Sequence, residues 1–267
     1  MSEAPAKPVE TGESSDIPFP EAPDPWMNLK AEFFGCVGRA KSLPSGSYAD
    51  LEAQSAFADP AASGEFRGVG ASVMIVRYTE TPVGPYDEIV WIPGYFDVPK
   101  KGIKKPRVTR IYVSNKDTIY NGRKNWNIPK HFAVFKFTPS EKPSIIPYSR
   151  LEVSLPSTPD QPFISIELSP VPVLSRPTLP ISTSYLPIDL GMWLPPNPES
   201  KDWKVDGMVG TTQWCHCEVG VSGWGRVMHV KGDLGDGRSF PKLDMPNYWV
   251  YVKEAKLTCK TVWSGEL

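Results

Sequence analysis

A lysine that follows a proline is the residue of this sequence best placed to do covalent chemistry. Lys130 comes directly after Pro129, which fixes the backbone ahead of it, and precedes the apolar stretch 132–137. Apolar surroundings lower the pKa of a lysine, because burial penalises its charged form. A lysine that is neutral at physiological pH attacks ketones and aldehydes to form a Schiff base. The alternative is a solvated lysine at the start of a strand, the commoner environment for this residue type.

Polar and aromatic residues near this lysine could bind a substrate. Arg110, Arg123 and Asn125 offer the hydrogen-bond donors that a carboxylate or a polyketide-like substrate would need as anchors. Tyr120 and Trp126 could line a cavity. Each has a structural alternative, because polar side chains also stabilise loops and aromatic side chains also fill ordinary cores.

Other reactive arrangements are weak. Cys215, His216 and Cys217 are consecutive, but in a strand the two cysteines share one face and the histidine takes the other. Buried strand cysteines are therefore expected rather than a metal site. The chain lacks a GxSxG motif, and the glycines of residues 232–237 lack the lysine of a phosphate-binding loop. We expect neither a metal nor a cofactor.

The composition excludes several classes of partner. Of 267 residues, 29 are Lys or Arg and 30 are Asp or Glu, so the net charge of −1 gives no basic field for nucleic acid or anionic lipid. No apolar run approaches the roughly 20 residues that cross a bilayer, and the N-terminus has no signal-peptide pattern. We expect a cytoplasmic protein with no nucleic-acid or membrane partner.

The elements expected around the lysine are mainly strands, because 30 prolines and 21 glycines argue against a helical bundle. The clearest helix is expected over residues 48–58, and Ser114 could cap a helical turn through residues 117–120. Residues 169–201 are too proline-rich for regular ladders and predict a wandering connection with pieces of edge strand. Strands rich in β-branched and aromatic residues are expected at 71–78, 86–92, 107–113, 132–137, 150–155, 163–168, 226–231 and 248–257.

Two regions are expected along the chain. Residues 1–25 are acidic, rich in proline and poor in bulky apolar residues, which predicts a disordered leader. Residues 26–267 show no internal repeat and no linker, and are expected to form a single domain.

Segments between residues 70 and 137 resemble the acetoacetate decarboxylase superfamily, in the order of the family. Tyr78–Glu80 resembles the segment with the active-site glutamate, and Gly84–Glu88 opens the strand that follows. The stretch from Asn121–Arg123 to Ile128–Lys130 resembles the loop with the Schiff-base lysine. The sequences of these motifs are most similar to those of the larger fungal-type branch of the superfamily.

The resemblance implies a predominantly β fold of the α+β class, a β-cone or double β-barrel with a few short helices around an apolar central cavity. It implies that Lys130 attacks the β-carbonyl of a 3-oxo acid, that the iminium accepts the electrons released as CO2 leaves, and that the enamine is then protonated. Glu80 would position the substrate or move protons. The family is itself a standard example of a lysine activated by desolvation or a cationic neighbour, so this mechanism is taken over from the resemblance.

One position departs from the family. Its decarboxylases carry a second lysine directly after the first, and here that residue is His131. A histidine can be neutral at physiological pH, so desolvation would have to lower the pKa of Lys130 further, or His131 could act as an acid or base.

The leading functional prediction is a Schiff-base-forming lyase that decarboxylates a β-keto acid. An aldolase, dehydratase or cyclase of secondary metabolism, acting on a larger oxo substrate with the same lysine, is the first alternative. A non-catalytic protein that binds a small ligand is the second. The expected partner is a small-molecule oxo acid or ketone, and because members of the family often form homo-oligomers, a homo-oligomer is expected.

Overall fold

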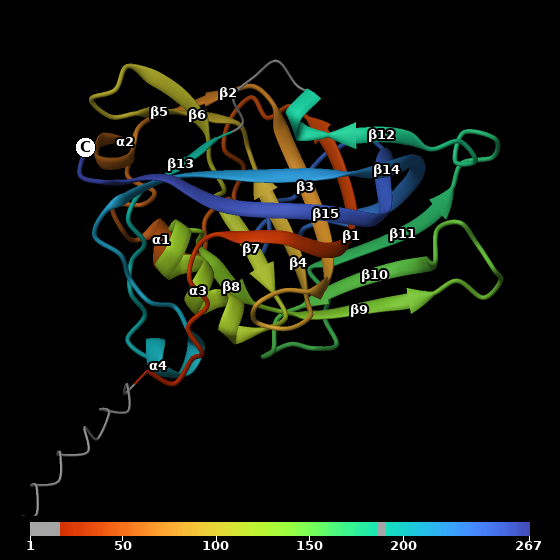
Figure 1. Ribbon diagram of the computed structural model, residues 1–267, viewed down its shortest axis with the longest axis horizontal. Helices are drawn as coiled ribbons and strands as arrows, with labels where there is room; N and C mark the ends of the chain where they lie inside the picture. Colours follow the sequence, from red (N-terminus) through yellow and green to blue (C-terminus); the bar gives the residue numbers. More distant parts are fainter. Residues whose placement is uncertain (1–16, 186–190) are drawn as a thin grey trace, which may run out of the picture.

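The computed structural model describes residues 17–185 and 191–267. Five strands form the centre of its main sheet: β1 (Trp26–Gly38), β3 (Ala71–Glu80), β4 (Tyr86–Ile92), β14 (Trp214–Leu234) and β15 (Tyr248–Gly265). They pair antiparallel in the order β4-β3-β1-β15-β14, so the N-terminal and C-terminal strands are adjacent in the middle of the sheet (Figure 1).

Shorter elements complete the fold. The helices are α1 (Asp50–Ala53), α2 (Pro60–Ser63), α3 (Lys116–Trp126), α4 (Trp203–Asp206) and a 3-10 turn at Thr183–Tyr185. The other strands are β2 (Phe66–Gly68), β5 (Tyr95–Val98), β6 (Ile103–Pro106), β7 (Arg110–Val113), β8 (Lys130–Phe132), β9 (Val134–Pro139), β10 (Tyr148–Ser154), β11 (Ile164–Pro170), β12 (Leu179–Ser182) and β13 (Met192–Leu194). The main sheet has the order β8-β7-β4-β3-β1-β15-β14-β11-β10-β9, β12 and β13 pair with β14, and β2, β5 and β6 form a second sheet. The predominantly β fold with a few short helices is confirmed.

Two apolar cores pack on opposite faces of the main sheet. On β4, Val90 and Ile92 belong to one core and Ile89 and Trp91 to the other, as the alternation of a strand requires. This explains why the four consecutive residues Ile89–Ile92 are all apolar. The core that holds Val90 and Ile92 surrounds a cavity, and the other fills the space under β9, β10 and β11.

Strand β1 was missed by the sequence prediction because its alternation is broken. Its register slips between Trp26 and Leu29 and again between Ala31 and Phe33, and Asn28 has a positive φ of 56°. Each slip moves later side chains to the other face, so no regular period of two survives in the sequence.

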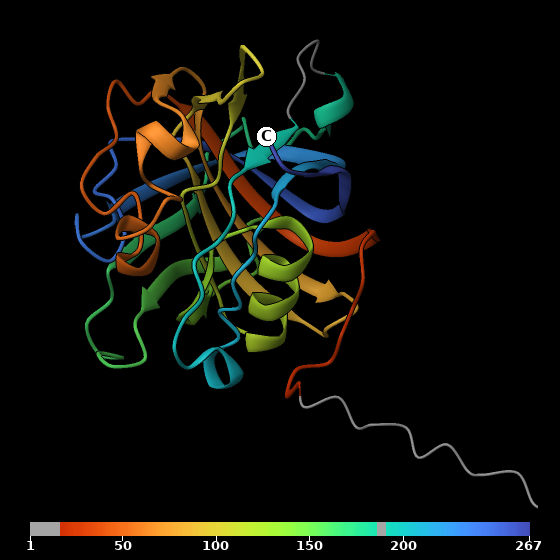
Figure 2. The same ribbon diagram turned by 90° about the vertical axis from the view of Figure 1, so that its left-hand side faces the viewer.

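Helix α3 is longer than the turn predicted at 117–120. Its cap is Asn115 rather than Ser114: the Asn115 side chain accepts a hydrogen bond of 2.7 Å from the Asp117 amide. The helix connects β7 to β8, which pair in parallel, and parallel neighbours need such a crossover. Figure 2 shows α3 in front of the strands, beside the segment that carries α4.

Other predicted elements differ in extent. The helix expected over residues 48–58 is confined to α1, the connection 169–201 contains the short strands β12 and β13, and the strand expected from residue 107 begins at Arg110. Of the expected leader, residues 1–16 lie outside the described residues, and residues 17–25 pack on α3. Phe19 stacks on Tyr120 there. Among the described residues, no helix has the length and apolar character needed to cross a membrane.

Candidate active site

Lys130 lies inside the molecule, at the first position of β8. Its side chain is 4% exposed, and Nζ lies 2.8 Å from Oε2 of Glu88 on β4. Nζ also donates to Oγ1 of Thr118 on α3 at 2.9 Å and approaches the Tyr86 hydroxyl at 3.4 Å. Two strands and one helix therefore fix the position of a single amine.

Local structure in α3 makes room for this lysine. Gly122 lies beside the aliphatic part of the Lys130 side chain, and a Cβ added there would come within 2.7 Å of Lys130 Cδ. After the helix, the Ile128 amide donates to the Gly122 carbonyl at 3.2 Å, and the Arg123 guanidinium contacts the Lys130 carbonyl at 3.4 Å. A glycine inside a helix costs about 1 kcal/mol relative to alanine, and here it gives the lysine its space.

The charge state of Lys130 differs from the sequence-based expectation. Burial lowers the pKa of Lys130, but the charge and hydrogen bond of Glu88, together with Tyr86, outweigh it and hold the pKa above its ordinary value. The expectation of a lowered pKa was therefore wrong for the free site. It rested on desolvation and did not include the carboxylate that faces the amine.

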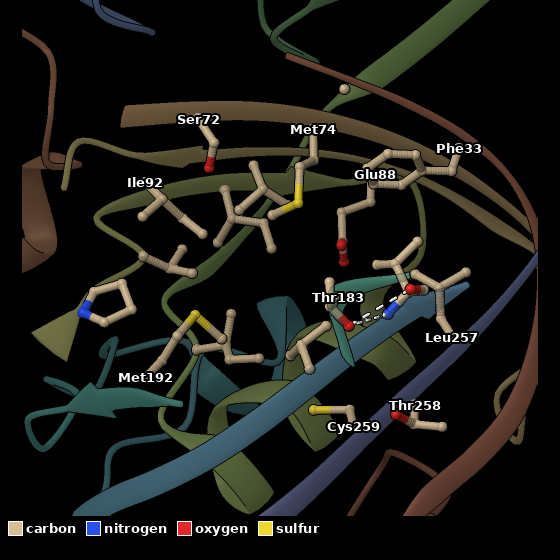
Figure 3. A pocket seen from close by; sticks show the side chains of 18 of the residues that line it. Phe33, Ser72, Met74, Glu88, Ile92, Thr183, Met192, Leu257, Thr258 and Cys259 are labelled. Carbon is tan, nitrogen blue, oxygen red and sulfur yellow. Dashed lines mark hydrogen bonds between the residues drawn. The ribbon is translucent and has the colours of Figure 1, made fainter. Parts of the chain in front are cut away.

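An apolar cavity of about 610 Å³ adjoins the ion pair. It is lined by residues of β1, β3, β4, β14 and β15, with Lys130, Trp126 and Ile128 among those at the side of α3 and β8. In Figure 3 the Glu88 side chain points into this space, between Met74 and Phe33 on one side and Thr183 and Leu257 on the other. The buried amine and its carboxylate thus lie at the wall of a chamber large enough for an organic ligand.

The glutamate expected beside the lysine was Glu80, and the structure places Glu88 there instead. Glu80 ends β3 at the surface, where its carboxylate pairs with Lys30 at 2.8 Å and both side chains are more than half exposed. The sequence does contain a signal for Glu88. It shares a strand face with Val90 and Ile92, so a charged side chain interrupts an apolar row that faces the core.

His131 and Arg123 form a separate buried network with Glu52. Glu52 accepts from Arg123 Nη1 at 2.9 Å and lies 2.7 Å from His131 Nε2, and both the Glu52 and Arg123 side chains are fully buried. Burial alone raises the pKa of the Glu52 carboxyl, but His131 and Arg123 outweigh it and lower the pKa to about 2. Neither His131 nor Arg123 lines the cavity. Their contacts join α1, α3 and β8, so their expected roles in catalysis and in substrate binding give way to structural ones.

Of the other four candidate substrate-binding residues, three make contacts within the fold and one lines the cavity. Arg110 donates to the Tyr112 hydroxyl at 2.6 Å, and Asn125 donates to the Ala22 carbonyl at 2.8 Å. Tyr120 packs against the residues before β1, and its hydroxyl lies 3.3 Å from Glu21 Oε1. Trp126 is the one of these four that lines the cavity, while its Nε1 donates to Asp24 at 2.6 Å.

The cysteines lie in the core. All four are buried and free, and Cys259 also lines the cavity. Among the described residues, no group of His, Cys, Asp and Glu side chains has the arrangement of a metal site.

Known structures share this architecture. An acetoacetate decarboxylase aligns with a TM-score of 0.51 at 13% identity over 92% of each chain. The enduracididine biosynthesis enzyme MppR, complexed with pyruvate, aligns with a TM-score of 0.50 at 14% identity over 97% of each chain. Acetoacetate decarboxylase from Legionella pneumophila aligns with a TM-score of 0.47 at 16% identity over 99% of each chain. No protein-family model and no curated protein sequence matches. The first two alignments confirm the resemblance at the level of fold: the chain has the acetoacetate decarboxylase-like fold.

Proposed function

We propose that the protein is an enzyme in which Lys130 forms a Schiff base with the ketone or aldehyde carbonyl of a small molecule. The observation that carries this proposal is a buried primary amine at the wall of an apolar cavity, with a carboxylate oxygen 2.8 Å away. A buried lysine that only stabilised the fold would have no need of an adjoining chamber. The shared fold supports the proposal, because acetoacetate decarboxylase has the same architecture.

Glu88 supplies the proton movement that the reaction needs. The Lys130 ammonium first transfers a proton to Glu88 Oε2, which leaves a neutral amine and a neutral acid. The amine attacks the carbonyl carbon, and Glu88 returns the proton as the hydroxyl group of the carbinolamine leaves as water. The product is a positively charged iminium beside a negatively charged carboxylate, so the total charge of the site is unchanged. Thr118 and Tyr86 orient the nitrogen through hydrogen bonds.

The iminium then activates the bond next to it. Nitrogen accepts an electron pair from that bond, which breaks to release CO2, an aldol fragment or a proton, and the enamine that remains is protonated. Water hydrolyses the resulting iminium and frees Lys130. Decarboxylation of a β-keto acid is one member of this set. Aldol cleavage, dehydration and cyclisation use the same intermediates, and the size of the cavity favours larger substrates for them.

Reductive trapping tests the proposal. The protein is incubated with acetoacetate or with a longer ketone, reduced with borohydride and digested, and the adduct is located by mass spectrometry. We expect the adduct on the peptide that holds Lys130, none in Lys130→Arg, and an unchanged yield in the control Lys124→Arg, whose lysine lies at the surface. Thermal unfolding of both variants establishes that they are folded. Labelling spread over exposed lysines, with none at Lys130, would reject the enzyme and favour a ligand-binding protein.

The same experiment separates the reaction classes. Release of CO2 in step with turnover of a β-keto acid identifies a decarboxylase. An adduct at Lys130 without CO2 release identifies aldol-type, dehydration or cyclisation chemistry.

A further inference from the structure

The cavity beside Lys130 has almost no charge of its own. Among the described lining residues, Lys130 and Glu88 are the two with side chains of the Lys, Arg, Asp or Glu type, and they form an ion pair with each other. Burial raises the pKa of the Tyr78 hydroxyl and of the Cys259 thiol well above their ordinary values, so these lining groups are neutral at physiological pH. The resident charge of the cavity therefore sums to zero.

The arginines that the sequence offered as anchors bind elsewhere. The Arg123 guanidinium is bonded to Glu52 and to the carbonyl groups of Val209 and Pro198. Arg110 alternates with Ile111 on β7, so it lies on the face of the sheet opposite to the cavity. A substrate carboxylate would find no guanidinium among the described lining residues.

Because the lining has no net charge, the charge of the substrate decides whether the occupied site is neutral. A neutral ketone keeps the site neutral at every step, because the iminium that forms is balanced by the Glu88 carboxylate. A 3-oxo acid adds one negative charge that no charged side chain of the described lining compensates. An unpaired carboxylate in an apolar cavity is strongly disfavoured, since its lost hydration is not replaced.

The lining and the size of the cavity favour a ligand that is mainly hydrocarbon. Six of its residues, from six different strands, present aliphatic or thioether side chains: Leu29, Met74, Val90, Met192, Val221 and Leu257. Methionine adapts to irregular apolar shapes. A volume of about 610 Å³ lies within the range of sites for drug-sized ligands, and a short-chain oxo acid would leave most of it empty.

We infer that the substrate is an uncharged, mainly hydrocarbon ketone or aldehyde, considerably larger than a short-chain oxo acid. This inference rests on the proposed Schiff base at Lys130. For such a substrate the iminium activates an α C–H bond, whose proton passes to Glu88, or an α C–C bond, in which case the proton of a β-hydroxyl group passes to Glu88 and the fragment leaves as an aldehyde or ketone. In both cases the electron pair of the broken bond moves to nitrogen, and no oxidant or reductant is needed.

A matched pair of probes tests the substrate class. 3-Oxooctanoate and its methyl ester share the ketone and the chain and differ in the charge of the carboxyl group. Each is trapped with borohydride, and labelling of Lys130 is divided by labelling of exposed lysines in the same sample, which corrects for intrinsic reactivity. We expect the ester to exceed the acid by about tenfold or more, the ratio that 1.4 kcal/mol of unpaired charge produces. Equal labelling, or preference for the acid, overturns the inference and leaves the Schiff base intact.

Two further arms complete the test. If neither probe labels Lys130 above the exposed lysines, the proposed function itself fails. In Glu88→Gln the resident negative charge is gone, so the ratio of acid to ester labelling within that variant is expected to rise severalfold. A ratio that does not change would show that charge is not what discriminates between the probes. Because both probes are compared within one variant, a general loss of reactivity does not affect the ratio.

Discussion

Replacing Glu88 by Gln should make the stability of this protein depend on pH in a way that the wild type does not. The variant keeps the size of the side chain but removes the charge 2.8 Å from Lys130 Nζ. Breaking a buried ion pair by removing one partner costs about 3–5 kcal/mol. The cost of neutralising the lysine gives a second value. At pH 7 it is about 1.36 kcal/mol for each of the ~3.4 pH units below the unfolded pKa of about 10.4, or about 4.6 kcal/mol. Both routes give a loss of roughly 4 kcal/mol at pH 7.

The sign of the pH dependence follows from linkage. In the wild type the pKa of Lys130 is raised, so its contribution to stability is fully present below the unfolded pKa and constant between pH 7 and pH 9.4. In the variant the Glu88 charge no longer opposes burial, the largest influence on the amine, and the contact with Tyr86 alone opposes it. We expect burial to depress the pKa of Lys130, so the unfolded chain binds one more proton than the folded one. Stability then rises with pH, by about 1.4 kcal/mol per unit, until the unfolded lysine itself titrates.

Urea unfolding at pH 7 and pH 9.4 measures the effect. The difference in free energy of unfolding between wild type and Glu88→Gln should shrink by about 3 kcal/mol over this interval. Glu80→Gln is the matched control, because it removes a carboxylate from an exposed pair with Lys30, worth roughly 0–1 kcal/mol at either pH. A difference for Glu88→Gln that is the same at both pH values would refute the reasoning, since Lys130 would then not be a charged amine held in the folded core by that carboxylate.

Two further substitutions test the surroundings of the amine. Gly122→Ala adds a methyl group where Lys130 Cδ now lies, so borohydride trapping at Lys130 should slow about tenfold. The melting temperature should change little, since alanine favours the helix by about 1 kcal/mol. An unchanged trapping rate would show that the lysine does not need this space. Glu52→Gln leaves Arg123 buried without its carboxylate and should cost about 3–5 kcal/mol at pH 7. Because the pKa of Glu52 is lowered to about 2, its contribution is present above an unfolded pKa of about 4.3 and is lost as pH falls towards 2, so acid unfolding curves of wild type and variant should converge in that window.

Much of the sheet could be predicted because its strands alternate or are apolar throughout. β3, β4, β10 and β11 lie close to the expected ranges, whereas β14 and β15 extend well beyond the ranges expected for them, 226–231 and 248–257. The failures have local causes. β1 loses its alternation at two bulges, and α3 carries Gly122 and Asn125 in its interior, which are poor helix formers. Packing overrides that propensity, since most of α3 is buried against the strands.

The site was predictable in part. Lys130 could be proposed from Pro129, the apolar stretch and the resemblance, but its partner could not be chosen by position in a motif. Glu80 and Glu88 are separated by a turn, and which of them reaches the core depends on the pairing of β3 with β4 and of β4 with β7. Glu88 lines the cavity and was not chosen, whereas Arg123 was chosen and does not line it. An arginine close in sequence to the candidate lysine was a plausible anchor for a substrate carboxylate, yet its guanidinium hydrogen-bonds to groups of the fold itself.

If Lys130 acts as proposed, the position of His131 limits how its amine can be activated. Consecutive residues of a strand point to opposite faces, so Lys130 faces the cavity and His131 faces Glu52. His131 therefore cannot act at close range in the cavity as a cationic neighbour that lowers the pKa of Lys130. What remains is the balance between the ion pair and its neutral form, a free amine beside a protonated Glu88. Under the proposed function, an apolar substrate in the cavity would place hydrocarbon beside the pair and favour the neutral form, because desolvation penalises both charges. An extended hydrocarbon substrate would thus help to generate the nucleophile that attacks it, whereas a small ligand would cover less of the pair.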